Sequence, residues 1–156
     1  MKLDWVAGNP QRMTASNAPL ETMLPALGES ASLSKLVSDA DVVKFGEVSL
    51  DLNPVHFDDA VAQRTRFGGR IAHGMLSASL VSAVLGTKLP GPGTIYLGQT
   101  LSFRGAVRIG DTITATVTVT GRREGRAILT LETVVKNQRD ELVLTGEATV
   151  LVEPLG

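Results

Sequence analysis

The feature that most constrains the fold is a change of hydrophobic period halfway along the chain. Residues 73–89, HGMLSASLVSAVLGTKL, are apolar or small on every side and carry no charge before Lys88, which predicts a helix buried all round. Residues 111–121, DTITATVTVTG, instead alternate strictly between aliphatic residues and threonine, as a half-buried strand does. A buried helix and long alternating strands fit together if an antiparallel sheet curves around the helix, which is an α+β fold.

Other segments supply the remaining elements. Residues 94–105, 126–137 and 142–153 have the composition of strands and are separated by turn-rich residues. Residues 31–37 alternate weakly and predict a first strand. Ser38 then precedes residues 39–49, where early acidic residues and spaced apolar ones predict an amphipathic helix capped by Ser38. We therefore expect a single domain over residues 29–156 and an N-terminal arm or extension over residues 1–28.

The composition narrows the class of partner. A net charge of −1 and a pI near 6.1 give no electrostatic reason to expect nucleic acid or an anionic membrane surface. The chain has no cysteine, which excludes disulfides, thiolate metal sites and cysteine nucleophiles and suits a reducing cytoplasm. It contains no run of 18 apolar residues that would span a membrane. The positive mean hydropathy of +0.14 favours a homo-oligomer that covers apolar surface.

The stretch DLNPVHFDD, residues 51–59, is the strongest candidate for chemistry. Pro54 fixes its own φ and keeps Asn53 out of the α region, so the backbone between Asp51 and His56 forms a corner rather than a plain helix. The carboxylate and the imidazole can therefore converge on one water molecule. Such a pair can orient the water, remove its proton and supply a proton to a neighbouring carbon. This is the machinery for adding water across a polarised double bond.

The start of the apolar helix is the second candidate. His73 leads this helix and Gly74 follows, so unpaired backbone N–H groups and a positive dipole end are open to a carbonyl oxygen. Stabilising a developing enolate oxygen there is typically worth about 3 to 4 kcal/mol. Ser82 is a polar group further along the same helix, able to bond either His56 or a backbone carbonyl one turn back.

Each residue also has a plain structural interpretation, and the spacing alone leaves both open. An Asp before Asn-Pro often forms a turn, His73 can cap or pack a loop, and Ser82 can be a small packing residue. Asp58 and Asp59 are typical of a solvent-facing first helical turn, and Arg64, Arg66 and Arg70 of either phosphate contacts or a solvated loop. Two histidines 17 residues apart without a shared helical face give only a weak metal signal, so we expect no metal site.

Four motifs taken together, DLNPVHFDD, GGRIAHGML, YLGQTLSF and VRIGDTI, resemble the MaoC-like (R)-specific enoyl-CoA hydratases of the hot-dog superfamily. The resemblance covers roughly residues 30–154. It implies a hot-dog fold, in which a curved antiparallel sheet wraps a long central helix and two subunits pair their sheets edge to edge in a homodimer. It also implies reversible syn hydration of trans-2-enoyl-CoA to (R)-3-hydroxyacyl-CoA without a metal or redox cofactor.

The resemblance assigns roles to individual residues. Asp51 and His56 match the catalytic pair that activates water, Gly74 the oxyanion hole, and Ser82 the serine that supports the hydrogen-bond network. Asn53, His73 and Leu85 are expected to contact the substrate, with Leu85 as a wall of the acyl tunnel. Residues 1–28 have no counterpart in the compact family pattern. A single unit of this fold suggests a short or medium acyl chain.

Two other functions stay open on the sequence alone. Hot-dog proteins commonly bind thioesters, so an acyl-CoA thioesterase is the first alternative and a non-catalytic acyl-thioester-binding subunit the second. In every case the expected partner is a thioester of coenzyme A or of acyl-carrier protein, which serves as substrate rather than as cofactor.

Overall fold

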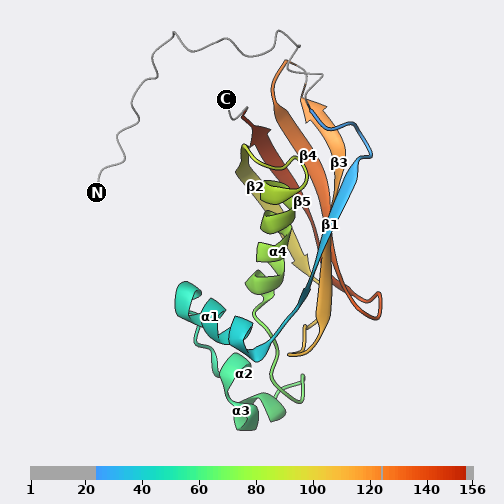
Figure 1. Ribbon diagram of the computed structural model, residues 1–156. Helices are drawn as coiled ribbons and strands as arrows, with labels where there is room; N and C mark the ends of the chain where they lie inside the picture. The colour runs from blue at the N-terminus through green and yellow to red at the C-terminus, as the bar shows by residue number, and fades with distance from the viewer. Residues whose placement is uncertain (1–23, 124, 154–156) are drawn as a thin grey trace, which may run out of the picture.

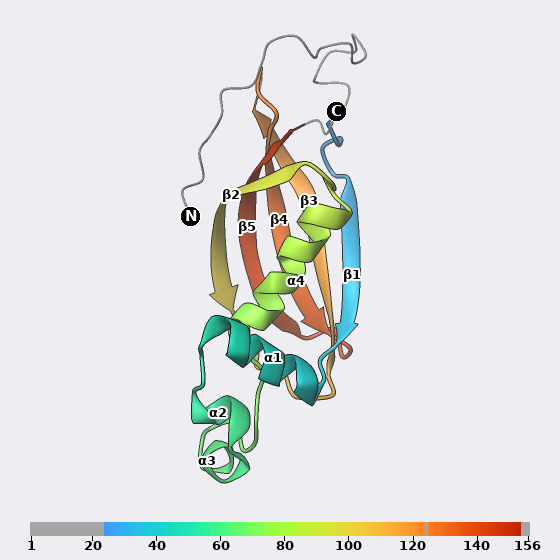
Figure 2. The same cartoon turned by 60° about the vertical axis from the view of Figure 1, so that its left-hand side comes forward.

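The computed structural model describes residues 24–123 and 125–153, which form one sheet and four helices. In chain order the elements are β1 (Ser30–Leu36), α1 (Asp39–Ser49), α2 (Pro54–Phe57), α3 (Asp59–Gln63), α4 (Gly74–Thr87), β2 (Thr94–Phe103), β3 (Thr112–Arg123), β4 (Ile128–Asn137) and β5 (Leu142–Val152). All strand pairs are antiparallel, in the order β1-β3-β4-β5-β2. The curved sheet wraps α4, whereas α1, α2 and α3 lie beyond one end of it (Figures 1 and 2).

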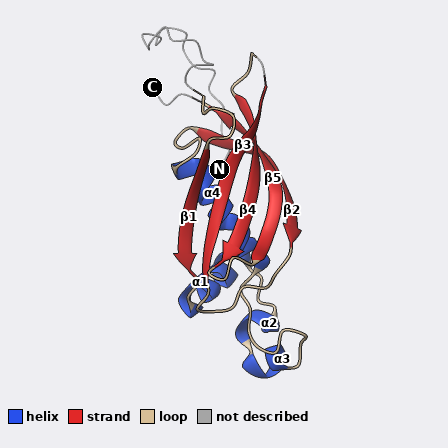
Figure 3. Cartoon of the chain, turned by 90° about the vertical axis from the view of Figure 1, so that its right-hand side faces the viewer, coloured by secondary structure: helices blue, strands red, loops and turns tan. Residues whose placement is uncertain are grey.

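The core lies between α4 and the concave face of the sheet, and the opposite face of the sheet is open (Figure 3). The predicted alternation of β3 is confirmed, because its aliphatic residues are buried while the threonines between them are partly exposed. The buried side chains of β3 are Ile113, Ala115, Val117 and Val119, each at most 1% exposed. They pack with Val81 and Val84 of α4 in one continuous cluster. The predicted α+β architecture is therefore present.

The prediction that α4 is buried all round is wrong within the single chain. Leu80 and Val84 face the sheet, but Ser79 and Ser82 are exposed and Met75 is 54% exposed. The sheet covers only one side of the helix, so the other side of this uniformly apolar and small surface stays open. The described residues of one chain therefore leave part of this apolar and small surface uncovered.

The predicted cap of α1 is confirmed in detail. The Ser38 hydroxyl accepts a hydrogen bond from the backbone N–H of Asp41, and the Asp41 carboxylate accepts one from the backbone N–H of Ser38, which is a reciprocal capping box. Lys35 also forms an ion pair with Asp41 at 2.9 Å. The hydrogen bond from the Lys35 ammonium, followed by those from Ser38, lowers the pKa of the Asp41 carboxyl from 3.8 to about 2.

The predicted arm over residues 1–28 lies mostly outside the described residues. Within the part of the chain that the structure describes, no helix combines the length and the apolar character needed to cross a membrane. The helical segment α1 to α3 is the part of the fold that carries the Asn-Pro corner to the N-terminal end of α4.

Candidate active site

The Asn-Pro corner joins the end of α1 to the start of α2. Leu50 ends α1 in the left-handed conformation with φ 61°, which turns the chain out of the helix at once. Asn53 caps α2 by accepting a hydrogen bond from the N–H of Val55, and Pro54 occupies the first helical position. The N–H of Asn53 in turn donates to the Asp51 carboxylate. The corner therefore fixes Asp51 through its own backbone.

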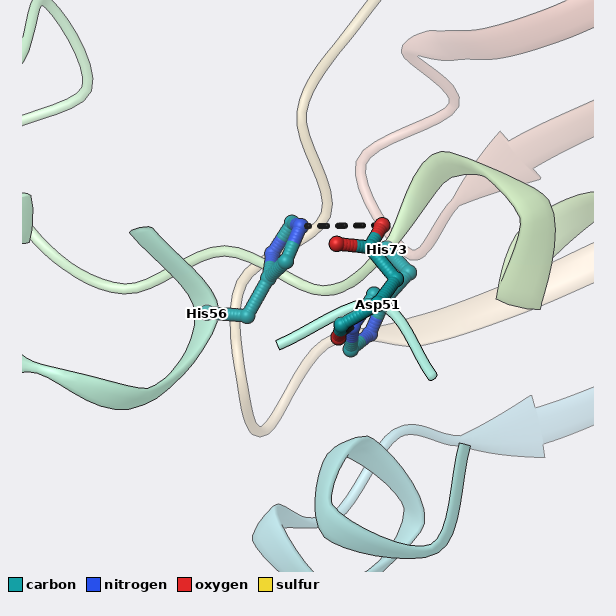
Figure 4. A group of neighbouring side chains, drawn as sticks. All are labelled: Asp51, His56 and His73. Atoms are coloured by element: carbon teal, nitrogen blue, oxygen red, sulfur yellow. Dashed lines mark hydrogen bonds and ion pairs between the residues drawn. The ribbon is translucent and has the colours of Figure 1, made fainter. Parts of the chain in front are cut away.

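Asp51 and His56 point toward each other across this corner (Figure 4). The Asp51 Oδ2 to His56 Nε2 distance is 4.0 Å, and the side chains are 52% and 9% exposed. This distance exceeds a hydrogen bond, but one water oxygen fits within hydrogen-bonding distance of both atoms. Half of the carboxylate surface is open, so a ligand has access to it.

The tautomer of His56 follows from its second nitrogen. His56 Nδ1 lies 2.8 Å from the carbonyl oxygen of Ile71, which can only accept, so Nδ1 carries the proton in the neutral ring. Nε2 therefore presents its lone pair toward Asp51. Both groups that face the intervening space are acceptors, which matches the two hydrogens of a single water molecule.

His73 contacts both residues of this pair. Its ring is 2% exposed and stacks on the His56 ring with centroids 3.9 Å apart. His73 Nε2 donates to the backbone carbonyl oxygen of Asp51 at 2.9 Å, and its Nδ1 has no hydrogen-bond partner among the described residues. Phe45 and Phe57 flank the ring. The prediction that His73 contacts the substrate stays a prediction, and this buried position favours a supporting role.

The N-terminal turn of α4 lies next to this histidine pair. Gly74 is the first residue of α4. The His73 side chain precedes the helix but accepts no hydrogen bond from its first N–H groups, so His73 does not block them. A Cβ atom at Gly74 would come within 2.9 Å of the Phe103 ring. Glycine therefore lets this aromatic ring close against the start of the helix and keeps the helix end narrow.

Among the described residues, three hollows adjoin the N-terminal half of α4, and two of them are larger than the third. An open groove of about 490 Å³ is lined by apolar and small side chains, including Met75, Ser82, Tyr96 and Leu97. Burial raises the pKa of the Tyr96 phenol, which fits this weakly polar setting. A second cavity, of about 410 Å³, is lined by Gly74 on another face of the helix.

Ser82 and Leu85 are placed differently from Asp51 and His56. Ser82 faces the apolar groove from an exposed position, and it makes no hydrogen bond to His56 within the single chain. Leu85 is 1% exposed and belongs to the hydrophobic core. The roles proposed for Ser82 in the hydrogen-bond network and for Leu85 in the tunnel remain predictions, as does substrate contact by Asn53.

Several supporting contacts have no signal in the sequence. Arg70 donates to the backbone carbonyl of His56 at 2.8 Å and to the Asp39 carboxylate at 2.6 Å, so it fastens α2 to α1. Arg108 donates to the carbonyl of Gly69 at 3.1 Å and also to that of Phe67. Three of these four acceptors are the backbone carbonyls of His56, Phe67 and Gly69, so the identity of the accepting residue carries no information there. Only the paired glycines before Arg70 indicate that a loop closes there.

The prediction of no metal site rests on the wide sequence spacing of the two histidines, but the fold brings these histidines together. The two histidines are stacked rather than separate, and ligand atoms of Asp51, His56 and His73 lie within 4.8 Å of one another. However, His73 Nε2 is already bonded to the Asp51 carbonyl and His56 Nδ1 to the Ile71 carbonyl. The absence of a metal therefore remains a prediction that experiment must test.

Comparison with known proteins places this geometry in a family. A family model described as a MaoC like domain matches residues 24–140. The (R)-specific enoyl-CoA hydratase of Rhodospirillum rubrum is 52% identical over 129 residues, which are 83% of this chain and 89% of that protein. The 3-hydroxybutyryl-CoA dehydratase of Methylorubrum extorquens is 48% identical over 130 residues, covering 81% and 80%.

A solved structure matches as well. The (R)-hydratase from Aeromonas caviae involved in PHA biosynthesis superimposes with a TM-score of 0.80 at 48% identity, over 83% of this chain and 98% of that chain. The expected fold, a curved antiparallel sheet around a long central helix as in hot-dog proteins, is thereby confirmed.

Proposed function

The chain belongs to the MaoC-like domain family, and from this membership we propose that it is an (R)-specific enoyl-CoA hydratase, a hydro-lyase. It adds water reversibly to the double bond of trans-2-enoyl thioesters and forms the (R)-3-hydroxyacyl product. The observation that carries the proposal is the corner itself, where a carboxylate and an imidazole with a free Nε2 lone pair lie 4.0 Å apart. Two acceptors at this distance suit one water molecule.

The catalytic pair acts on one face of the substrate. Asp51 and His56 accept the two hydrogens of a bound water, so an oxygen lone pair is free to attack C3 of the enoyl group. One proton passes from the water to the pair as the C–O bond forms, and a proton passes from the pair to C2 as the enolate collapses. Because both transfers use the same pair, the addition is syn, and the reverse sequence is dehydration.

The first turn of α4 stabilises the enolate. The thioester carbonyl oxygen accepts a hydrogen bond from the Gly74 N–H at the positive end of the helix. His73 acts as a positioning residue, because its bond to the Asp51 carbonyl ties the corner to the helix that holds the thioester. A single histidine thus couples the water site to the carbonyl site.

The apolar groove suits the acyl chain. Its lining has no charged residue: Met75 and Leu97 are apolar, and Ser79, Ser82 and Gln99 supply polar groups. We assign it short or medium acyl chains, in line with the C4 substrate named for the Methylorubrum relative.

The exposed edge of the sheet supports a homodimer. β2 is an edge strand and exposes Ile95, Leu97 and Phe103 at 41%, 53% and 52%. An apolar edge strand invites pairing with another strand. We propose that two chains pair their sheets through β2. Light scattering on the purified protein should give twice the chain mass of 16.4 kDa, and a monomeric mass would contradict the assembly.

The decisive experiment is a chain-length series of trans-2-enoyl-CoA substrates with chiral analysis of the product. We expect loss of the enoyl absorbance and formation of the (R)-3-hydroxyacyl-CoA. Release of free thiol, detected with a thiol reagent, would instead identify a thioesterase. Tight binding of enoyl-CoA without turnover would identify a non-catalytic thioester-binding subunit.

The reaction needs no metal or redox cofactor, since acid–base groups and a helix end supply the chemistry. Activity should therefore survive dialysis against a chelator, and loss of activity that added zinc restores would assign the Asp51, His56 and His73 group to a metal. We propose the cytoplasm as the location, because a chain without cysteine requires no oxidising compartment. Cell fractionation tests this location.

A further inference from the structure

The cavity of about 410 Å³ beside Gly74 differs in charge from the apolar groove. Its lining contains two arginines, Arg66 and Arg104, and no acidic residue. Both arginines are exposed, and no ion pair joins either to an acid within the described residues. The cavity therefore presents uncompensated positive charge to solvent, which favours an anionic ligand.

The two arginines are held at the cavity in different ways. The Arg66 guanidinium lies 4.9 Å from the centroid of the Phe67 ring, which restricts its orientation. The backbone N–H of Arg104 donates to the Val143 carbonyl at 2.8 Å, so this residue is anchored at the end of the sheet. Their neighbours Arg70 and Arg108 are already occupied by bonds to Asp39 and to backbone carbonyls.

Two residues that line the cavity also belong to the candidate reaction site. Ile71 lines it and holds His56 Nδ1 with its carbonyl, and Gly74 lines it and follows the stacked His73. Ser77, one turn into α4, also lines it, is 1% exposed, and has a hydroxyl without a hydrogen-bond partner among the described residues. A polar, positively charged hollow thus starts at the carbonyl site, and an apolar one lies on another face of the same helix.

This arrangement matches a ligand with three parts. An acyl-CoA thioester has an apolar tail, a carbonyl in the middle and an anionic phosphate-bearing arm. With the carbonyl at Gly74 and the tail in the uncharged groove, the anionic arm fits the hollow that Gly74 itself lines, which carries two arginines and no acid. We propose, on the basis of the proposed function, that Arg66 and Arg104 bind the phosphates of coenzyme A and that its pantetheine arm runs through this cavity.

The test separates phosphate recognition from catalysis. The Arg66→Ala/Arg104→Ala double variant is compared with wild type on crotonyl-CoA and on crotonyl-pantetheine, which has the same reacting group but no phosphate. We expect the KM for crotonyl-CoA to rise about tenfold or more, with kcat within twofold, and the KM for crotonyl-pantetheine to stay unchanged. Arg64→Ala is the matched control, because Arg64 is exposed on the same loop but does not line the cavity.

A phosphopantetheine thioester separates the contributions of the two ends of the arm. If the arginines bind the phosphate nearest the arm, crotonyl-phosphopantetheine loses affinity as the CoA substrate does; if they bind the outer phosphates, it behaves like crotonyl-pantetheine. Either pattern supports phosphate recognition. An unchanged KM for crotonyl-CoA in the double variant, or an equal rise for all three substrates, would overturn the inference.

A binding measurement keeps the inference independent of turnover. Titration calorimetry with free coenzyme A should show about tenfold weaker binding to the double variant than to wild type and to Arg64→Ala. This comparison decides the inference even if the wild-type protein hydrates no enoyl thioester, which would be a failure of the proposed function alone. Equal binding of coenzyme A by all three proteins would reject the arginine site.

Discussion

Two regions of the molecule are held together by different forces. The sheet and α4 rely on aliphatic burial, with residues such as Leu129, Leu131 and Leu144 wholly inaccessible to solvent. The segment from α1 to the start of α4 relies instead on directional contacts: the capping box at Ser38, the arginine contacts to carbonyls, and the two stacked histidines. We expect the first region to set the stability of the fold and the second to set the geometry of the candidate active site.

This difference teaches where stability and activity should separate. Burial is non-directional and scales with the apolar area removed from water, so a truncated core residue lowers stability without a specific effect on chemistry. A polar group at the corner contributes little burial, so its loss should alter the reaction while the fold persists. Substitutions in each region test this separation.

The largest expected effect is on the rate. Asp51→Asn keeps the size of the side chain but weakens its ability to accept a water hydrogen and to exchange a proton. We expect kcat for crotonyl-CoA hydration to fall by about 10²- to 10⁴-fold, the usual contribution of a general acid–base group. The midpoint of thermal unfolding should stay unchanged, because the carboxylate is half exposed.

The control for this variant is Asp59→Asn, which removes an exposed carboxylate in the first turn of α3. It should leave both the rate and the melting temperature as in wild type. Wild-type turnover in Asp51→Asn would contradict the proposed catalytic role of Asp51. It would also contradict the expectation that polar residues at the corner control the rate.

The second effect concerns the core. Leu131→Ala in β4 creates a cavity against α4 and should cost about 2 to 5 kcal/mol in unfolding free energy, or roughly 5 to 15 °C in the melting temperature. Activity per folded molecule at low temperature should remain near that of wild type. Calorimetry and steady-state kinetics on the same sample check both statements. The control is Val48→Ala, since Val48 is 86% exposed and its loss should change neither quantity.

The third prediction concerns His73, which leads α4 and contacts the corner. His73→Phe keeps an aromatic ring in the stack but leaves the Asp51 carbonyl without its donor. We expect a loss of about 1 to 3 kcal/mol in stability together with about tenfold in kcat. His73→Gln restores a donor and should recover most of the rate. A His73→Phe protein that is less stable but fully active would confine His73 to packing.

The core region was predictable from the sequence because its forces leave a periodic pattern. Alternating residues in β3 and the uncharged run of α4 specify which faces are buried, and the structure agrees for β3. The prediction failed for the outer side of α4, where Ser79 and Ser82 are exposed. A hydrophobic pattern predicts that a surface is buried, but it does not predict whether the same chain or another one covers that surface.

The site was predictable only in part, because its contacts are not periodic. Pro54 predicts the corner because it restricts the backbone angles of two residues, Asn53 and itself. The Asp51 and His56 side chains do point toward each other, with Oδ2 and Nε2 4.0 Å apart. The hydrogen bond between His73 and the Asp51 carbonyl joins residues 22 positions apart and ends on the backbone. The residue type at position 51 therefore does not predict it. The contact between His56 Nδ1 and the Ile71 carbonyl also ends on backbone, so the residue type at position 71 does not predict it.

The smallest expected effect is at the far end of the polar region. The pKa of Asp41 is held at about 2 against an ordinary 3.8 by Lys35 and by the bonds from Ser38. A lowered pKa stabilises the fold above pH 4, and this contribution disappears as the pH falls from about 4 to 2. Because Lys35 is 42% exposed, we expect about 1 kcal/mol rather than the full value that the lowering implies.

Urea unfolding of wild type and Asp41→Asn at pH 7 and at pH 2 measures this contribution. The variant should be about 1 kcal/mol less stable at pH 7, and most of this difference should be lost at pH 2, where about half of the wild-type carboxyl is protonated. Asp140→Asn is the control, since its ion pair with Lys136 is exposed and should contribute nothing measurable. Turnover of Asp41→Asn at pH 7 should match wild type, because the capping box anchors the start of α1 and the corner is held separately by Arg70 and His73. A drop in turnover without a drop in stability would show that the polar region transmits strain from its first residue to its last, and that directional contacts act there as one unit.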